Sequence, residues 1–353
     1  MVVETLDPSH LALIAAQPSP ALQETAPLIP HLRRWLLGAS LRPILTALLP
    51  FATHQELILT AREGNRVLAL CCCSPANRRR SCWQLDDRLV LAASATLPRR
   101  QVERSLLQEA MHRVQGAGSW MARIDAADGD GLSLLRELGY QSLRHSSLWS
   151  LPAVAPRSTR PPLPPLPDGL ELMPIDRSQL NLFRQLEQSA CPPALRELLD
   201  RRLEDLLDQC GRGSRLLVDR RRQTALAALR RIPDRWRPAG PATLELLCHR
   251  AWDSRLDQGL AWLLQVRPRG ASSAVVRVDD PCGELRSWLT RHDCEPVGDE
   301  VLMARSVWRR QQRAHAVPAT RRLEVMLGKL QPGRTPLPTP ATPLPPSPGT
   351  LLR

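Results

Sequence analysis

Residues 258–261 have the composition of a turn that could hold a phosphate group. Gly259 and Ala261 are small, and a larger side chain at either position would block the backbone amides of the turn from an anion. Arg255 adds a positive charge just before the turn, and the backbone amides around Gln258, Gly259 and Leu260 could hold the phosphate. A helical pattern of leucines covers 256–266, so the turn lies near the beginning of a helix.

The flanking residues predict a strand on each side of this helix. Apolar runs cover 244–248 and 274–278, and Pro268 with Gly270 ends the helical pattern. Two parallel strands joined by a helix place the amino end of the helix at the carboxyl edge of the strands. That end carries unpaired N–H groups and partial positive charge, so it can bind a phosphate.

Glu245 interrupts the first of these apolar runs. An isolated carboxylate in an apolar strand costs free energy unless it is paired or functional. Two interpretations therefore stay open: a functional carboxylate, or one that pairs with one of the many arginines or faces solvent at a strand edge.

The same order of elements occurs twice in the chain: a strand, two helices, three strands, a long helix, a strand, a short helix and a last strand. The first copy begins with a strand predicted over 11–16, and the second contains helices predicted over 176–189 and 192–209. Arg123-Ile124-Asp125 recurs as Arg277-Val278-Asp279. We interpret this as a divergent duplication.

This order of elements resembles the GNAT superfamily of acetyl-CoA-dependent N-acyltransferases. Two local segments add to the resemblance: Gly259-Leu260-Ala261, which is similar to the family's Gln/Arg-x-x-Gly-x-Gly/Ala pattern, and 134–140, which ends in Leu-Gly-Tyr like the family's closing helix. Leu256 departs from the first pattern, because it stands where Gln or Arg is expected.

The resemblance implies an α/β fold with a mixed sheet and two GNAT-like domains in tandem. The predicted boundaries are a degenerate GNAT-like domain over 1–151, a Pro-rich linker over 152–168, a second GNAT-like domain over 169–308, and a basic, then Pro-rich disordered tail over 309–353.

The resemblance also implies acetyl-CoA, or another acyl-CoA, as co-substrate and a small-molecule or peptide amine as acceptor. It assigns the catalytic base to Glu245. The tyrosine that usually protonates the thiolate has no counterpart in the second domain, where Cys282 and His292 are the available substitutes. The residues that it assigns to the cofactor are Arg255, Gln258, Gly259, Leu260 and Ala261.

The first domain fits this chemistry less well. Its corresponding turn, 98–103, contains no glycine, and Glu103 places a carboxylate where the diphosphate would lie. We therefore expect a non-catalytic first domain that supports the second. A catalytically inactive pair kept for binding or scaffolding remains an alternative.

Composition limits the remaining possibilities. The net charge is +13, but all except one of the 48 basic residues are arginines, so the charge indicates a compositional bias more than a nucleic-acid partner, which stays a third possibility. Nine scattered cysteines, without zinc spacing, predict buried thiols in a reducing compartment and no metal site. Without a long apolar run or a signal peptide, we expect a cytoplasmic protein without membrane contact; the oligomeric state stays open.

Overall fold

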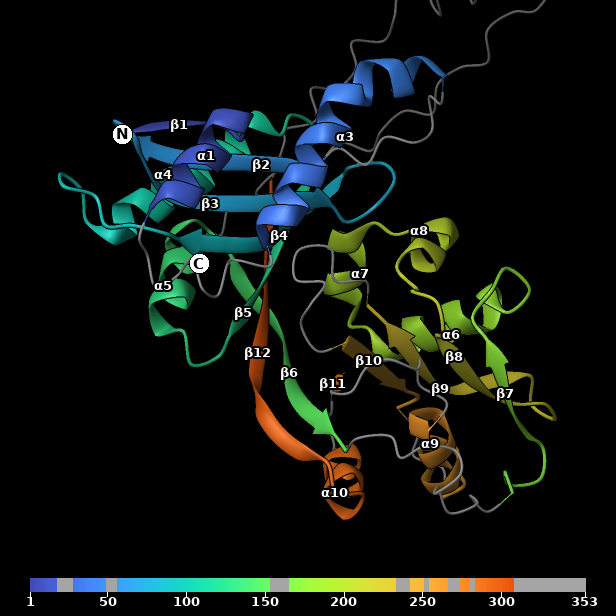
Figure 1. The fold of residues 1–353 in the computed structure, drawn as a ribbon. Coiled ribbons are helices and arrows are strands. Elements are labelled where there is room, and N and C mark those ends of the chain that lie inside the picture. Colours follow the sequence, from blue (N-terminus) through green and yellow to red (C-terminus); the bar gives the residue numbers. More distant parts are fainter. Residues whose placement is uncertain are drawn as a thin grey trace, which may run out of the picture. The chain divides into compact units, whose positions relative to one another are not determined.

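A mixed sheet of 12 strands organises the chain, in the order β1-β2-β3-β4-β5-β12-β6-β11-β10-β9-β8-β7 (Figure 1). The structure is a computed structural model. It describes residues 1–17, 28–48, 56–152, 165–232, 242–250, 254–265, 274–279 and 283–307, and within the helix over 28–48 it describes the side chains of 29–39.

The first half of the sheet is built from residues up to 151. Its elements are β1 (Val2–Thr5), α1 (Pro8–Ala16), α3 (Leu28–Leu48), β2 (Leu57–Glu63), β3 (Arg66–Pro75), β4 (Cys82–Val90), α4 (Arg99–Arg113), β5 (Ser119–Asp125), α5 (Gly129–Glu137) and β6 (Gln141–Leu151).

The second half repeats the strand order of the first. Its elements are β7 (Leu170–Pro174), α6 (Leu180–Ala190), α7 (Pro193–Leu199), α8 (Leu203–Asp208), β8 (Arg215–Asp219), β9 (Thr224–Arg231), β10 (Ala242–Cys248), α9 (Leu256–Gln265), β11 (Ala274–Val278), α10 (Glu284–Arg291) and β12 (Glu295–Ser306).

The last strand of each half is exchanged with the other half. β12 pairs antiparallel with β5, from Glu300 beside Asp125 to Ser306 beside Ser119, and its other edge pairs with β6. β6 pairs in turn with β11. In Figure 1, β12 runs in orange between the green strands β5 and β6. Each half therefore completes its sheet with a strand of the other, which makes residues 1–307 one compact unit.

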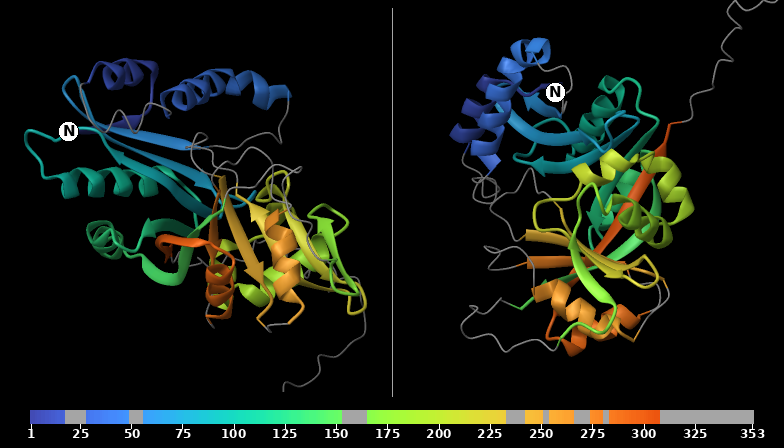
Figure 2. Two further views of the ribbon diagram at one scale, coloured as in Figure 1. Left: turned by 60° about the horizontal axis from the view of Figure 1, so that its bottom comes forward. Right: turned by 90° about the vertical axis from the view of Figure 1, so that its right-hand side faces the viewer.

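Alternation along β5 shows which helices cover which face of the sheet. Trp120, Ala122 and Ile124 pack in the core formed with α4 and α5, whereas Met121 packs with α7 of the second half. α1 and α3 cover a cluster over β2 and β3. In the second half, α6 and α8 cover one face, while α9 and α10 cover the other (Figure 2).

The strand predicted over 11–16 is wrong, because these residues form most of α1. The carboxylate of Asp7 accepts hydrogen bonds from two backbone amides of the first helical turn, and Pro8 occupies the first helical position. The edge strand β1 lies earlier in the chain and pairs with β2. An apolar run this short does not distinguish a strand from a buried helix.

The single helix predicted over 192–209 divides into α7 and α8. Between them Asp200 has a left-handed backbone, with φ of 45°. Its side chain accepts a hydrogen bond of 2.6 Å from Ser81 Oγ, and Asn77 Nδ2 donates to the carbonyl of Leu199 at 2.9 Å. The segment between α7 and α8 is therefore held by hydrogen bonds to the turn between β3 and β4 of the first half.

Other sequence predictions concern the cysteines and the Pro-rich segments. Cys71, Cys72 and Cys73 are buried in β3 and face alternate sides, as predicted for core thiols. Residues 153–164 of the predicted linker and the whole predicted tail, 309–353, lie outside the described residues. Among the described helices, none combines the length and the apolar character needed to cross a membrane.

Candidate functional site

The amino end of α9 lies at the edge of the sheet where two parallel strands end. β10 and β11 pair in parallel, and α9 connects them in the chain, so the segments around the predicted phosphate turn lie side by side. The Gly259 amide donates to the Arg255 carbonyl at 3.3 Å. The amides of 256–258 precede this bond and have no carbonyl partner within the helix. They can therefore hold an anion at the helix end.

Gly259 itself is buried on the side of α9 that packs against the sheet. A β-carbon at this position would lie 2.4 Å from Cδ2 of Leu217 on β8. The missing side chain thus lets the helix approach the sheet, independently of any ligand. Replacement of Gly259 by glutamate would consequently disturb packing, so it is a poor test of phosphate binding.

The turn predicted over 258–261 is wrong, because these residues belong to α9, and the other residues assigned to the cofactor lie in this helix or directly before it. Leu260 is buried in the core under α9, Ala261 is half-buried, and Gln258 is exposed in the third helical position. Arg255 Nη2 donates to Asp219 Oδ2 at 2.7 Å, and this hydrogen bond lowers the pKa of Asp219. The cofactor role of these residues stays a prediction, and Gln258 is the one whose side chain faces solvent most fully.

In the first half, the parallel strands β4 and β5 stop pairing before they end, and an arginine spans the gap between them. β4 and β5 pair in parallel as far as Leu85 beside Ala122. Further along β4, Arg88 forms a hydrogen-bonded ion pair with Asp128 at the start of α5, and its Nη1 lies 3.8 Å from Oε2 of Glu103 on α4. Ion pairs therefore connect β4 to both helices that cover this gap.

In the second half, apolar residues occupy the corresponding positions of the two parallel strands. If Arg277 is the counterpart of Arg123, β10 and β11 stay paired two residues further than β4 and β5, as far as Leu246 beside Val278. Leu246 and Val278 are both buried in the core under α9. The two halves thus differ in the residues at the end of their parallel strand pair.

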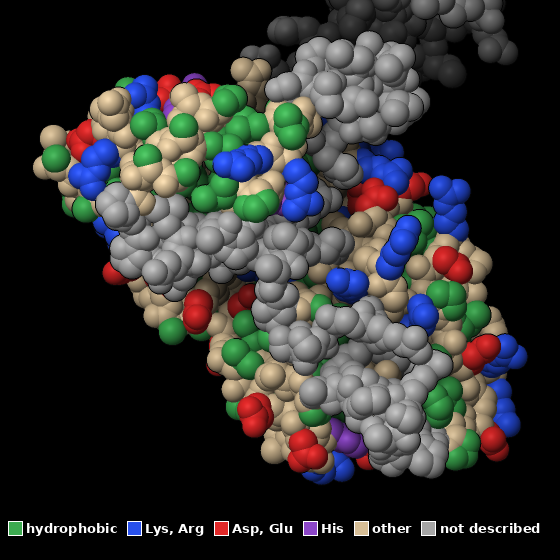
Figure 3. Space-filling view, viewed as in Figure 1, with side chains coloured by type: hydrophobic (Ala, Val, Ile, Leu, Met, Phe, Trp, Pro, Cys, Tyr) green, Lys and Arg blue, Asp and Glu red, His purple; other side chains and the backbone are tan. Residues whose placement is uncertain are grey.

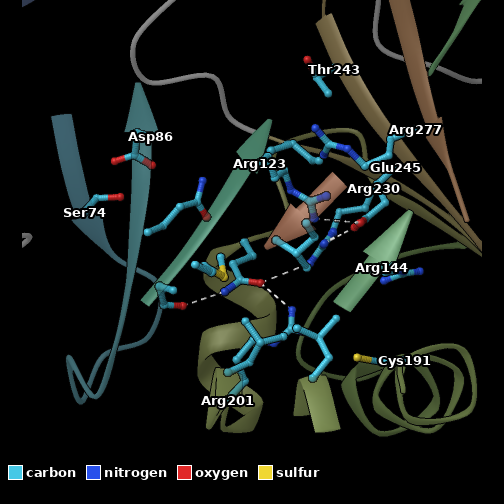
Figure 4. A pocket seen from close by; sticks show the side chains of 18 of the residues that line it. Ser74, Asp86, Arg123, Arg144, Cys191, Arg201, Arg230, Thr243, Glu245 and Arg277 are labelled. Carbon is cyan, nitrogen blue, oxygen red and sulfur yellow. Dashed lines mark hydrogen bonds and ion pairs between the residues drawn. The ribbon is translucent and has the colours of Figure 1, made fainter. Parts of the chain in front are cut away.

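A cavity of about 440 Å³ lies where the two halves meet, on the face of the sheet covered by α6, α7 and α8 (Figure 4). Strands of both halves line it. Figure 3 shows arginine side chains gathered around this junction, with acidic side chains among them. The charged residues of the lining are Asp86, Asp87, Arg123, Arg144, Glu187, Arg201, Asp208, Arg230, Glu245, Arg277 and Glu300.

Glu245 lies in this cavity and is 4% exposed. Its carboxylate accepts a hydrogen bond from Arg230 and lies 3.9 Å from Arg123 Nη2. Burial alone would raise the pKa of Glu245, but the charges of Arg230, Arg123, Arg144 and Arg277 hold it far below its ordinary value. A carboxylate held in its charged form is a weak proton acceptor. These surroundings favour the paired interpretation of Glu245, and its role as a base stays a prediction.

The same carboxylate belongs to an ion-pair network that connects the two halves. Arg277 donates two hydrogen bonds to Glu300, of 2.6 Å from Nε and 3.2 Å from Nη2. Arg123 Nη1 lies 3.9 Å from Glu300 Oε2. At the far end, Arg230 Nη1 donates to Gln209 Oε1 at 3.3 Å. The network therefore extends from β12 across β5 and β10 to β9.

The sequence identified Glu245 but not the arginines around it. Arg123 and Arg277 entered the prediction only as parts of the repeated tripeptide. Each interrupts an apolar strand, as Glu245 does, and three such charges in buried strands could have been paired with one another. Their distribution between two halves hid this pairing, since the exchange of strands has no local signal.

The substitutes suggested for the missing tyrosine give little support to that role. His292 follows α10, and its ring lies against Trp288 with 4.1 Å between the ring centroids. Cys282 lies outside the described residues. The only tyrosine, Tyr140, is buried in the core of the first half.

Comparison with known proteins identifies the fold. A GCN5-related N-acetyltransferase from Sphaerobacter thermophilus is similar over 86% of this chain and 95% of its own, with a TM-score of 0.50 and 15% identity. A Drosophila protein is similar over 87% of this chain and 98% of its own, with a TM-score of 0.50 and 12% identity. A tandem GNAT protein from the clavulanic acid biosynthesis pathway has a TM-score of 0.42, with 14% identity over 72% of this chain and 84% of its own.

The chain has the GNAT fold, in two halves arranged in tandem around a mixed sheet, as the sequence predicted. A similarity that covers 86% of the chain includes both halves. No protein-family model matches the sequence, and none of the curated proteins matches it. The identities of the similar structures are low, so the comparison concerns the fold.

Proposed function

We propose that the chain transfers an acyl group from a coenzyme A thioester, such as acetyl-CoA, to an amine, and that the second half holds the thioester. The observation that carries this proposal is the amino end of α9 at the edge where β10 and β11 end. Three amides there precede the first helical hydrogen bond, which suits a diphosphate. The GNAT fold supports the reaction class by analogy.

The residues around this helix end fit such a group. Gln258 is exposed and can donate from its side chain. Arg255 stands next to the first helical residue. Asp257 adds a negative charge to the same turn, but Arg291 Nη2 lies 3.5 Å from its carboxylate and reduces the repulsion.

We assign the acceptor amine to the cavity that contains Glu245. Acyl transfer forms a C–N bond while the C–S bond breaks; the amine loses a proton and the thiolate gains one. Glu245 keeps its charge and holds Arg230 and Arg123 in position, so we assign it to the organisation of the acceptor site. Bound acyl-coenzyme A would supply the activated carbonyl carbon.

A charge placed at the end of α9 tests the cofactor part of the proposal. Gln258→Glu adds a carboxylate beside the expected diphosphate and should weaken acetyl-CoA binding at least about tenfold, measured by calorimetry. The variant should remain as stable as the wild type, because an acidic residue in the first turn is favourable to the helix itself.

The first half provides a matched control for this variant. Gln101 is also exposed and also occupies the third position of its helix, α4. Gln101→Glu should leave acetyl-CoA affinity unchanged. If both variants weakened acetyl-CoA binding equally, or if neither variant weakened it, the assignment of the thioester to the second half would be contradicted.

A second candidate function is binding of acyl-CoA without transfer. The observation that favours it is the strongly paired state of Glu245, which removes the one carboxylate assigned as base. A chain that binds acetyl-CoA but releases no coenzyme A thiol with any amine offered would fit this second function.

A further inference from the structure

The cavity between the halves has carboxylates on one side, and on the other side arginines together with Glu245 and Glu300. On one side β4 contributes Asp86 and Asp87. Arginines line the other side, from β5, β6, β9 and β11. Figure 4 shows Asp86 across the cavity from Arg230, with Arg123 between them. A ligand that fits both walls carries a positive and a negative group at separate positions.

Most arginines of the lining have a carboxylate of their own. Arg230 pairs with Glu245 and Arg277 with Glu300. Two further ion pairs occur in the lining. One joins β6 to the residue after β11, and the other joins the segment between α7 and α8 to α6. These are Arg144 with Asp279 and Arg201 with Glu187.

Arg123 is the exception among these arginines. Its closest carboxylate oxygens, of Glu245 and Glu300, lie 3.9 Å away, beyond hydrogen-bond distance. Among the described residues its Nη1 has no hydrogen-bond partner, although the atom is buried. Burial, followed by the nearby charge of Arg277, lowers the pKa of Arg123 to about 9. A guanidinium with unmet donors in a cavity is a ready partner for an added carboxylate.

Arg230 has a further unmet donor beside it. Its Nη1 and Nη2 donate to Gln209 and Glu245, but within the described part of the chain Nε is buried without a partner. Arg230 is 8% exposed. Arg123 on β5 and Arg230 on β9 both approach Glu245, so donors on two arginines remain for one anionic group.

Part of the lining is apolar. α7 contributes Leu195 and Leu199, β5 contributes Met121 and β12 contributes Leu302. These side chains offer an aliphatic ligand a surface away from the charged walls. A volume of about 440 Å³ is sufficient for a small molecule of this kind.

We propose that this cavity binds an amine that also carries a carboxylate, namely a free amino acid with an aliphatic side chain, as the acceptor of the acyl group. Arg123 and Arg230 would bind the carboxylate, Asp86 and Asp87 would face the amine, and the leucines of α7 would contact the side chain. This inference rests on the proposed acyl transfer, and it names the class of acceptor.

Direct binding separates this inference from the transfer reaction. We would titrate the full chain with L-leucine, with L-leucinamide, which lacks the carboxylate, and with 4-methylpentanoate, which lacks the amine. Each titration would be done with and without saturating acetyl-CoA. Leucine should bind at least about tenfold more tightly than either analogue, because each analogue lacks one of the two charged groups that the site is proposed to hold.

Variants of Arg123 assign the binding to the cavity. Arg123→Gln should reduce leucine affinity at least about tenfold. Arg123→Lys should keep only part of the wild-type affinity, because lysine retains the charge but cannot form the bidentate hydrogen bonds of a guanidinium. The control Arg136→Gln, on the exposed side of α5, should leave the affinity unchanged.

The outcomes decide between the two proposals. Leucinamide binding as tightly as leucine would indicate a peptide or simple amine acceptor and would overturn the inference, as would unchanged affinity in Arg123→Gln or no leucine binding at millimolar concentrations under either condition. Leucine binding without any acetyl-CoA binding would support the cavity but contradict the proposed transfer.

Discussion

The two halves share their order of elements but differ at the gap between their central parallel strands. In the first half, Arg88 crosses this gap and pairs with carboxylates on α4 and α5. In the second half, Leu246 and Val278 occupy the corresponding depth, and α9 begins with a turn whose amides precede any helical bond. The first half thus has ion pairs at this position, and the second half has apolar side chains. The two halves therefore repeat the order of elements without repeating the residues at this position.

The largest expected effect follows from the exchanged strands. Expression of residues 1–152 alone, or of 165–307 alone, should give a chain without a cooperative thermal transition, because each piece leaves long strand edges and apolar core unpaired. Circular dichroism on heating measures this directly. If either piece unfolded cooperatively near the temperature of the intact chain, the halves would be independent and the comparison would lose its basis.

A smaller but still large effect is expected at Glu245. Glu245→Gln leaves Arg230 and Arg123 without their shared carboxylate and should lower the free energy of unfolding at pH 7 by about 3–5 kcal/mol. Because the folded pKa is lowered, the wild-type carboxylate contributes stability above its unfolded pKa of about 4.3, and this contribution is lost as the pH falls through the folded value.

Urea unfolding of both proteins at several pH values checks this prediction. The difference between wild type and Glu245→Gln should be largest at neutral pH and shrink in strong acid. The matched change in the first half, Asp86→Asn, removes a carboxylate that also lines the cavity. A Glu245→Gln variant as stable as the wild type, with acyl transfer abolished, would restore the interpretation of Glu245 as a base.

The smallest of these effects is expected at the first-half gap. Arg88→Ala removes the bridge from β4 to Asp128 and Glu103 and should cost about 1–3 kcal/mol of stability, measured by thermal or urea unfolding. It should not create acetyl-CoA binding in this half, since Glu103 remains beside the expected diphosphate position. A second bound acetyl-CoA in this variant would show that Arg88 alone closes the first site.

The sequence predicted the repeated order of elements well, because buried strands such as 274–278 and the amphipathic α9 carry their periodicity locally. It failed where the decisive interaction is not periodic. The N-cap at Asp7 stabilises a helix over a short apolar run that was predicted as a strand. The left-handed backbone of Asp200 divides the single helix predicted over 192–209 into α7 and α8. Both depend on single side chains or backbone positions that hydrophobic patterns do not record.

The candidate site was predictable only in part. The position of Glu245 in an apolar strand signalled a buried charge, and the helix after β10 signalled an anion site. The cavity itself could not be predicted, because Arg123 reaches Glu245 only through the exchange of β6 and β12 between the halves. Gly259 shows the opposite case: a small residue that matches a cofactor pattern also satisfies a packing contact with Leu217.

The number of acetyl-CoA molecules that the wild-type chain binds tests the central claim most directly. Calorimetric titration should give one site per chain, and ligand at a hundred times its dissociation constant should stabilise the fold by about 2.7 kcal/mol. Two sites of similar affinity would show that the first half keeps its cofactor geometry. No binding at all would contradict the assignment of the thioester to the amino end of α9.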